Sequence, residues 1–299
     1  MRSKAFAIAL AATSFLAAVP ATAPAQSVDR SMLWRVNVFG ADGHDPRRIQ
    51  PRSEGEGQAL AGVGVIHNRA PIAMIGDDDH VHYARGQATA FLVSPCLAVS
   101  NYHAVYGEGE ATDERDFAVN FSVGDRPDDR GFSDTVRAVP AFHGAFDETD
   151  EGQDWVVLRL DRCLGTTIGW LSLSDIGAEA LKPAQVSTAG YPAEKAPGRL
   201  WREDGCHLKH RPGEPALMAS DCSATPGASG SPVFVMQDGK PRVVGIVEGA
   251  ENDVDGVQRR WNPEIANLVV DIGSLLARAD VRAAIAADIR RNAAVPAGS

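Results

Sequence analysis

The segment best suited to chemistry is Thr225–Phe234, which reads T-P-G-A-S-G-S-P-V-F. Glycines at 227 and 230 flank Ser229, and glycine lets the backbone make a tight turn that a substrate can approach closely. A serine hydroxyl acts as a nucleophile when a base removes its proton and hydrogen-bond donors face the oxyanion that forms. Gly227 and Ser229 could direct two backbone N–H groups at that oxyanion. Taken alone, the segment fits a Gly/Ser-rich turn between two strands equally well.

Two upstream segments contain the residues that such a serine would need. His103 follows the run L-A-V-S-N-Y at 97–102, and Asp154 begins the run D-W-V-V-L-R-L. Each has an ordinary explanation, because a lone histidine after a strand is usually a surface or structural residue and an aspartate before a strand usually forms a turn. Together they place a base, the carboxylate that orients it and a nucleophile in the order His, Asp, Ser, which is an established order for a catalytic triad.

The elements that must position these residues are predicted to be short β-strands. From residue 59 onward, apolar and β-branched runs alternate with clusters of Gly, Pro and Asp, which favours an all-β sandwich or barrel over alternating strands and helices. The clearest runs are 61–67, 89–93, 97–100, 117–123, 155–160, 185–189, 232–236 and 242–247. Only the end of the chain predicts a helix, because Val281, Ile285 and Ile289 recur every four residues.

With these motifs, the chain resembles the chymotrypsin-like (trypsin-like) serine peptidases, and most closely their bacterial glutamyl-endopeptidase branch. The motifs that carry the resemblance are G-A-S-G-S-P-V-F at 227–234, S-N-Y-H-A-V at 100–105, D-W-V-V-L-R-L at 154–160 and A-G-Y-P at 189–192, followed by Trp201. The resemblance covers residues 60–290. It implies an all-β fold of two six-stranded antiparallel β-barrels with the active site in the cleft between them, plus a C-terminal α-helix. His103 and Asp154 would come from the first barrel and Ser229 from the second.

The predicted division of the chain begins with a secretory signal peptide at residues 1–25. Arg2 and Lys4 give a basic start, an uncharged apolar run follows, and Ala23-Pro24-Ala25 is a pattern that signal peptidase cleaves. We expect, in order, an N-terminal extension or pro-segment at 26–58, the first barrel at 59–165, the second barrel at 166–272, and the C-terminal helix and tail at 273–299. The signal predicts an exported protein, either periplasmic or extracellular.

One departure from the resemblance concerns activation. Trypsin-like zymogens carry an aspartate directly before the nucleophile, where it pairs with a newly cut N-terminal amine, and this chain has Ala228 at that position. Alanine carries no charge and cannot form the ion pair. Activation through that salt bridge is therefore excluded, although removal of residues 26–58 by another route remains open.

The residues at the family's substrate-binding positions predict a neutral pocket. By the resemblance, Ser223 lies at the base of the primary pocket, and Thr225, Val247, Glu248 and Gly249 complete the substrate-binding set. Trypsin-like enzymes have a carboxylate at the position of Ser223, and glutamyl endopeptidases have a histidine at the position of Val247. Because neither partner for a charged side chain is present, we expect cleavage after uncharged residues. The role of Glu248 is open.

The four cysteines, Cys96, Cys163, Cys206 and Cys222, predict two disulfides. An exported protein meets an oxidising environment, and a set without a C-x-x-C pair does not fit the common zinc sites. Three pairings are possible. We favour Cys206–Cys222, which would close a loop just before the nucleophile segment, and Cys96–Cys163, which would join the strand of the histidine to the end of the strand of the aspartate.

Charge and composition exclude several classes of partner. The formal net charge is −10, and loss of Arg2 and Lys4 with the signal would make it −12 (−10 − 2). An acidic chain without a basic, aromatic-rich cluster argues against nucleic-acid binding, and no later segment is apolar enough for membrane insertion. We expect a monomer that takes a polypeptide substrate. We expect no cofactor and no metal, since the acidic run 77–82 fits a turn and His207 and His210 have metal-like spacing only on a helix.

Two other functions compete with a peptidase. An α/β-hydrolase esterase requires a histidine after its nucleophile, and none of the eight histidines follows Ser229. A non-catalytic binding or scaffold protein on a protease fold stays open as the alternative, because a fold does not dictate a function. All three triad motifs are intact, which favours the peptidase.

Overall fold

The computed structural model of the chain describes residues 38–39, 44–51, 56–68, 72–75, 81–84, 87–106, 119–125, 132–145, 151–174, 176, 186–195, 198–250 and 266–293. The predicted signal peptide at 1–25 lies outside these residues, as do most of the predicted extension and Asp77–His80 of the acidic run. Among the described helices, none has the length and apolar character needed to cross a membrane.

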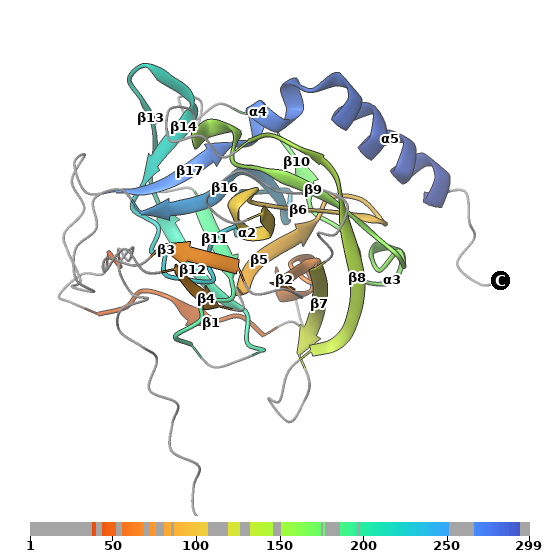
Figure 1. Ribbon diagram of the computed structural model, residues 1–299, viewed down its shortest axis with the longest axis horizontal. Helices are drawn as coiled ribbons and strands as arrows, with labels where there is room; N and C mark the ends of the chain where they lie inside the picture. The colour runs from red at the N-terminus through yellow and green to blue at the C-terminus, as the bar shows by residue number, and fades with distance from the viewer. Residues whose placement is uncertain are drawn as a thin grey trace, which may run out of the picture.

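The first half of the molecule is a closed barrel of six antiparallel strands (Figure 1). Around the barrel the order is β2-β5-β6-β9-β8-β7. The bounds are Val63–Asn68 for β2, Gln87–Leu92 for β5, Leu97–Ser100 for β6, Val119–Asp125 for β7, Phe132–His143 for β8 and Val156–Leu160 for β9. Successive strand residues point to opposite faces, so Ala90 and Leu92 join a buried cluster confined to this half, whereas Phe91 joins one that extends into the second half.

The second half is a nine-stranded sheet that forms a half-barrel against the first (Figure 1). Its path is β1-β12-β11-β15-β16-β17-β14-β13, and β10 pairs with β16 in parallel. The bounds are Arg48–Ile49 for β1, Ser172–Leu173 for β10, Val186–Gly190 for β11, Trp201–Cys206 for β12, Leu208–Arg211 for β13, Glu214–Ser220 for β14, Pro232–Gln237 for β15, Lys240–Ala250 for β16 and Asn267–Asp271 for β17. The two-barrel fold expected from the sequence is confirmed, with the second barrel open and extended by β1 and β10.

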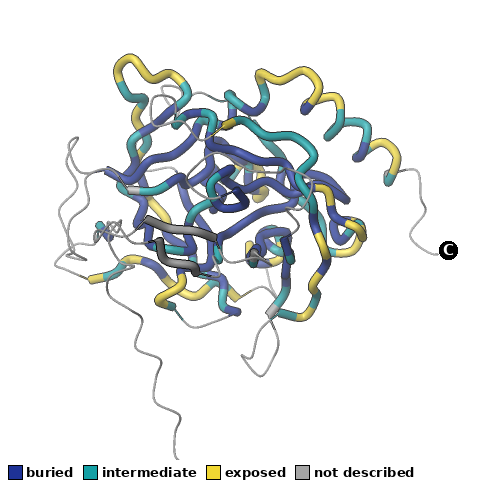
Figure 2. The backbone as a smooth tube through the Cα atoms, in the orientation of Figure 1, coloured by how far each residue is buried: buried dark blue, intermediate teal, exposed yellow. Residues whose placement is uncertain are grey.

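The remaining elements are short, apart from one helix at the end of the chain. β3 pairs with β4 in a two-stranded sheet, and the described residues also form five shorter helical segments. Their bounds are Ile72–Ile75 for β3, Val81–Ala84 for β4, Glu56–Ala59 for α1, His103–Tyr106 for α2, Glu151–Gln153 for the 3-10 helix η4, Gly165–Ile168 for α3, Ile272–Ala277 for α4 and Ala279–Ala293 for α5. Most strand residues are buried, whereas the tip of β13–β14 and one side of α5 are exposed (Figure 2).

The C-terminal helix α5 is fixed to the first barrel by a buried carboxylate. Val281 is fully buried, as the four-residue period predicted. Asp288, which is 2% exposed, accepts hydrogen bonds from Ser94 Oγ at 2.6 Å and from the Cys96 backbone N–H at 2.8 Å. The helix therefore connects the end of the chain to the disulfide-bonded turn before β6.

We expect Asp288→Ala to destabilise the protein by about 2–4 kcal/mol, because the substitution leaves two buried donors without an acceptor. The matched control is Asp134→Ala, which removes an exposed ion pair with Arg162 and should cost less than about 1 kcal/mol. Denaturant unfolding of both variants measures the difference. Equal losses of unfolding free energy in the two variants would contradict this account of the helix.

Candidate active site

His103 and Asp154 meet because the strands that carry them are paired. β6 ends at Ser100, β9 begins at Val156, and these two residues are direct partners in the antiparallel register. His103 starts α2 just after β6, and Asp154 immediately precedes the strand run of β9. The Asn101 side-chain amide also donates to the Asp154 backbone carbonyl at 2.9 Å, which fixes the two strand ends to each other.

The carboxylate of Asp154 holds His103 through two hydrogen bonds. Oδ1 accepts from the His103 backbone N–H at 2.9 Å, and Oδ2 lies 2.6 Å from Nδ1 of the ring. Asp154 is fully buried, and the His103 side chain is 18% exposed. With Nδ1 engaged by the carboxylate, Nε2 is the ring nitrogen that can exchange a proton with another group.

Ser229 lies in the second of two consecutive reverse turns, 225–228 and 228–231. The Ala228 N–H donates to the Thr225 carbonyl at 2.8 Å, and the Ser231 N–H donates to the Ala228 carbonyl at 2.9 Å. The third residue of each turn is a glycine with positive φ, +89° for Gly227 and +82° for Gly230. A side chain at either would also collide with backbone, since a Cβ on Gly230 would lie 2.0 Å from the Thr89 carbonyl oxygen. Pro226-Gly227 is the dipeptide typical of such a turn.

The turns leave two backbone donors available beside a partly exposed serine. Neither the N–H of Gly227 nor that of Ser229 donates a hydrogen bond to any residue that the structure describes. Ser229 itself is partly exposed. The turns therefore leave two backbone N–H groups that can donate hydrogen bonds to a negatively charged oxygen.

The nucleophile turn is held against the strand that leads to the histidine. The Thr89 N–H in β5 donates to the Ser229 carbonyl at 2.8 Å. A Cβ on Gly230 would lie 2.3 Å from Ser100 Oγ at the end of β6. The nucleophile turn therefore packs against the end of β6, three residues before His103.

Glu248 lies in the same place, which the sequence did not predict. One oxygen of its carboxylate lies within 4.8 Å of both a ring nitrogen of His103 and a carboxylate oxygen of Asp154. The register of β16 against β17 shifts between Val247 and Gly249, and such an irregularity re-aims a side chain. Glu248 is 4% exposed. A strand position expected to face substrate instead adds a second carboxylate beside the histidine.

The same three side chains are the one set in the described residues whose spacing would suit a metal ion. One imidazole nitrogen and two carboxylate oxygens are ligands that zinc accepts. The 2.6 Å contact between His103 Nδ1 and Asp154 Oδ2 is a hydrogen bond, and an ion that used these two atoms would have to displace its proton.

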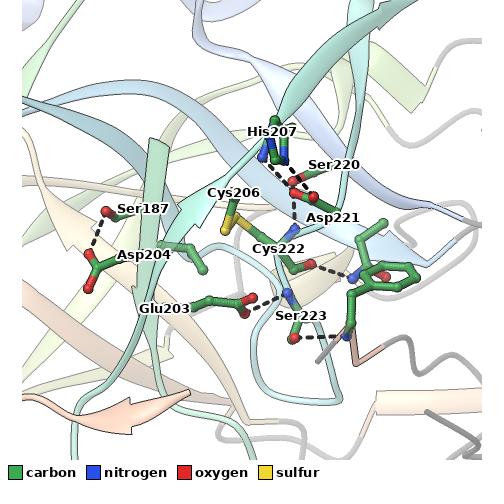
Figure 3. Close-up of a disulfide and its surroundings, with 12 residues drawn as sticks. Ser187, Glu203, Asp204, Cys206, His207, Ser220, Asp221, Cys222 and Ser223 are labelled. Carbon is green, nitrogen blue, oxygen red and sulfur yellow. Dashed lines mark hydrogen bonds and ion pairs between the residues drawn. A yellow bond between two sulfur atoms is a disulfide. The ribbon is translucent and has the colours of Figure 1, made fainter. Parts of the chain in front are cut away.

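The expected base of the primary pocket is connected to a carboxylate that sequence reasoning missed (Figure 3). Ser223 is buried, its backbone N–H donates to Glu203 Oε2 at 2.7 Å, and its hydroxyl accepts from the Phe39 N–H at 3.1 Å. Burial raises the pKa of Glu203 to about 7, against the hydrogen bonds from Ser223 that lower it. Nothing in the run W-R-E-D-G-C marks Glu203, because its burial depends on a contact with a residue twenty positions away.

The other predicted substrate-binding residues are Thr225, Val247, Glu248 and Gly249. Thr225 is buried and hydrogen-bonded to Arg47. Val247 is buried in the apolar cluster of the second half, which also contains Cys222 and Ala224 on either side of Ser223. Beside Gly249 the space is open, because a Cβ placed there would meet no atom within 4 Å.

Both disulfides of the structure join the pairs favoured from the sequence. Cys96 is bonded to Cys163, and Cys206 is bonded to Cys222 (Figure 3). The second bridge connects the end of β12 to the residue before Ser223. It therefore fixes the strand that carries Glu203 to the segment that leads into the nucleophile turn.

We expect Glu203 to make stability fall as pH rises. Its pKa in the folded protein, about 7, exceeds the ordinary value of 4.5, so the folded state holds this proton more tightly than the unfolded state. The stabilisation is complete below about pH 4.5 and is lost as pH rises through 7, a loss of about 3 kcal/mol. Glu203→Gln keeps the acceptor oxygen and removes the charge, so this loss should vanish.

Urea unfolding at pH 5 and pH 8 checks this, with the exposed carboxylate of Glu214 as control. The Glu214→Gln variant should follow the wild-type protein at both pH values. If Glu203→Gln loses as much unfolding free energy between pH 5 and pH 8 as the wild-type protein does, Glu203 is already charged in the folded state at pH 5, which would contradict this prediction.

Comparisons with known proteins agree with this geometry. The profile described as "Trypsin-like peptidase domain" matches residues 88–246, a span that contains His103, Asp154 and Ser229. A solved Glu endopeptidase in complex with MPD is similar with a TM-score of 0.56 and 17% sequence identity, covering 83% of this chain and 99% of that chain. Protease Anisep from Arthrobacter nicotinovorans is similar with a TM-score of 0.53 and 12% identity, covering 75% of this chain and 93% of that chain. No curated protein matches the sequence.

At these identities the two solved structures establish the fold, which is the two-barrel arrangement described above. The family match spans more than half of the chain. The chain therefore belongs to the trypsin-like peptidase family, and it is a chymotrypsin-like serine endopeptidase.

Proposed function

We propose that the protein hydrolyses peptide bonds through a triad of His103, Asp154 and Ser229. The observation that carries the proposal is the Asp154–His103 pair, fixed by two hydrogen bonds at the ends of paired strands, with Ser229 on a turn packed against the same strand end. The buried carboxylate keeps the proton of the ring on Nδ1, so Nε2 can act as the base.

Each residue has one role in the proposed mechanism. Ser229 Oγ attacks the carbonyl carbon of the scissile bond while His103 Nε2 takes its proton. The oxyanion of the tetrahedral intermediate accepts hydrogen bonds from the N–H groups of Gly227 and Ser229. His103 then gives the proton to the leaving amine, which breaks the C–N bond and leaves an acyl-enzyme. Water, deprotonated by His103, attacks the acyl group and releases Ser229.

We further propose a primary pocket that takes uncharged side chains. Ser223 and Val247 are neutral, and the carboxylate that accepts a hydrogen bond from the Ser223 N–H is that of Glu203. A glutamate side chain loses the water around its charge when it enters a pocket, which costs several kcal/mol unless a cation or several donors replace that water. Glu203 and Glu248 both oppose such a substrate electrostatically. Among the remaining assignments, Thr225 and Gly249 would contact the substrate chain beside these residues.

The proposal includes export and a simple assembly. Residues 1–25 would be removed as a signal peptide, leaving the extension at 26–58, the barrels at 59–165 and 166–272 and the C-terminal helix and tail at 273–299. The two disulfides are consistent with an oxidising periplasmic or extracellular location. The enzyme would act on polypeptides as a monomer.

Ser229→Ala should abolish turnover and leave the fold intact, because alanine removes only the attacking oxygen from a partly exposed position. The expected loss is on the order of 10⁶ in kcat, as for other triads. A fluorophosphonate probe should label the wild-type protein at Ser229 and leave Ser229→Ala unlabelled. Ser231→Ala is the control within the same turn, and the probe should still label it at Ser229.

This experiment also decides the alternative, a non-catalytic binding protein on a protease fold. A folded wild-type protein that neither reacts with the probe nor cleaves a casein substrate would support that alternative. Undiminished cleavage by Ser229→Ala would exclude Ser229 as the nucleophile.

Substrate choice is tested by cleavage of a mixed peptide library. Cleavage should follow small or apolar residues, with glutamate disfavoured, because the residues that the structure describes around Ser223 offer no unpaired cation to a carboxylate. Glu203→Gln should relax the exclusion of glutamate above pH 7, where Glu203 is ionised in the wild-type protein. A dominant preference for glutamate in the wild-type protein would show that the pocket residues are wrongly assigned.

A further inference from the structure

Arg47 belongs to the predicted N-terminal extension, yet its guanidinium is buried against the nucleophile segment. The side chain is 5% exposed. Nη1 donates to Thr225 Oγ1 at 2.9 Å, and Nη2 donates to Glu194 Oε1 at 2.7 Å. Nε and Nη2 also donate to the carboxylate of Asp45 at 2.9 and 2.8 Å. Although burial alone would lower the pKa of Arg47, these two carboxylates raise it, so the guanidinium is charged and held on three sides.

Thr225 closes a ring of hydrogen bonds with the two charged residues. Its hydroxyl accepts from Arg47 and donates to Glu194 Oε2 at 2.8 Å, while Arg47 contacts the other oxygen of the same carboxylate. A hydroxyl that accepts one bond and donates another has a fixed orientation. The ring therefore fixes the side chain of Thr225 more firmly than either bond would alone.

Thr225 is also the first residue of the turn that contains Gly227. Its carbonyl accepts from the Ala228 N–H at 2.8 Å, and the neighbouring Pro226 carbonyl accepts from the Ala193 N–H at 2.7 Å. The turn presents the Gly227 N–H, one of the two proposed oxyanion donors. A displacement of Thr225 would therefore move that donor, and oxyanion stabilisation depends strongly on donor position.

The segment that carries Arg47 is itself built into the second half. Arg48 and Ile49 form β1, which pairs with Trp201 and Arg202 of β12. The Gln50 N–H donates to the Leu200 carbonyl at 2.8 Å. Arg47 therefore directly precedes a strand of the sheet and does not belong to a loosely attached segment.

We propose that Arg47 is a positioning residue for the oxyanion-binding turn, acting through Thr225 and Glu194. This inference rests on the proposed peptidase function. A buried cation of the same chain would then hold the turn through Thr225, next to Ala228, which cannot form an ion pair. It also means that the working enzyme keeps the part of the extension that contains Asp45–Gln50, so that no activating cleavage removes it.

Arg47→Ala should lower kcat by about 10²–10³, as expected when one oxyanion donor is lost, and should change KM only a few-fold. Arg48→Ala is the matched control at the neighbouring position, because Arg48 is exposed and, among the described residues, forms its ion pair with Asp204 on the surface. The control should retain the wild-type kcat. Millimolar guanidinium chloride, far below denaturing concentrations, should restore part of the kcat of Arg47→Ala by filling the vacated site, a recovery that a general loss of stability would not give.

Thr225→Val provides a second route if Arg47→Ala folds poorly. Valine keeps the shape of threonine and lacks the hydroxyl, so kcat should fall without rescue by guanidinium. The double variant should be no slower than the slower single variant, because both changes break the same ring. Additive losses, a wild-type kcat in Thr225→Val, or a wild-type kcat in folded Arg47→Ala would each overturn the proposal.

The two proposals fail in different ways. If the fluorophosphonate probe does not label wild-type Ser229, the peptidase function fails whatever Arg47 does. If the wild-type enzyme is labelled and turns over but Arg47→Ala is equally fast, only the role of Arg47 is overturned.

Discussion

The hydrogen bonds of one threonine connect the two halves of the active site. Thr89 in β5 is fully buried and uses every polar group it has. Its N–H donates to the Ser229 carbonyl, its hydroxyl donates to the Gly227 carbonyl and accepts from the Tyr191 N–H, and its carbonyl accepts from Ser100 Oγ. A base on one barrel and a nucleophile on another can react only if their separation is fixed to a fraction of an ångström. Thr89 supplies that constraint.

Thr89 joins the Asp154–His103 pair to the nucleophile turn, and these two parts of the site are held by different contacts. The Asp154–His103 pair is held by the pairing of β6 with β9 inside the first barrel. The nucleophile turn depends on glycines at positive φ and on contacts from three directions, including the Gly230 N–H bonded to the Val247 carbonyl at 2.8 Å. Glu248, in β16 of the second half, places its carboxylate close to His103 and Asp154 of the first half. Two carboxylates, one from each half, therefore lie beside the ring of His103.

The sequence predicts what is local and misses what is brought together by the fold. The strand runs, the C-terminal helix and the triad motifs are readable because each is a short pattern with a known period or turn chemistry. Both disulfides join the cysteine pairs favoured from the sequence, since each pair lies next to a segment that carries one of the motifs. Arg47 could not be found, because it meets Thr225 across 178 positions and its neighbours G-H-D-P-R-R read as a polar turn. The interpretation of 26–58 as a separate extension missed β1 for the same reason, since the partner strand begins at Trp201.

The neutrality expected of the substrate pocket has a different basis in the folded protein. Sequence reasoning derived it from missing charges at Ser223 and Val247. Beside Thr225 the fold gathers Arg47 and Lys195 against Asp45 and Glu194, two cations paired with two carboxylates through direct contacts.

Beside those four paired charges, Glu203 is the buried carboxylate that accepts a hydrogen bond from the Ser223 N–H. Its raised pKa keeps it mostly neutral in mildly acidic solution and charged in alkaline solution. The charge beside Ser223 therefore becomes more negative as pH rises through 7, and in the pocket that we propose this change disfavours a substrate carboxylate.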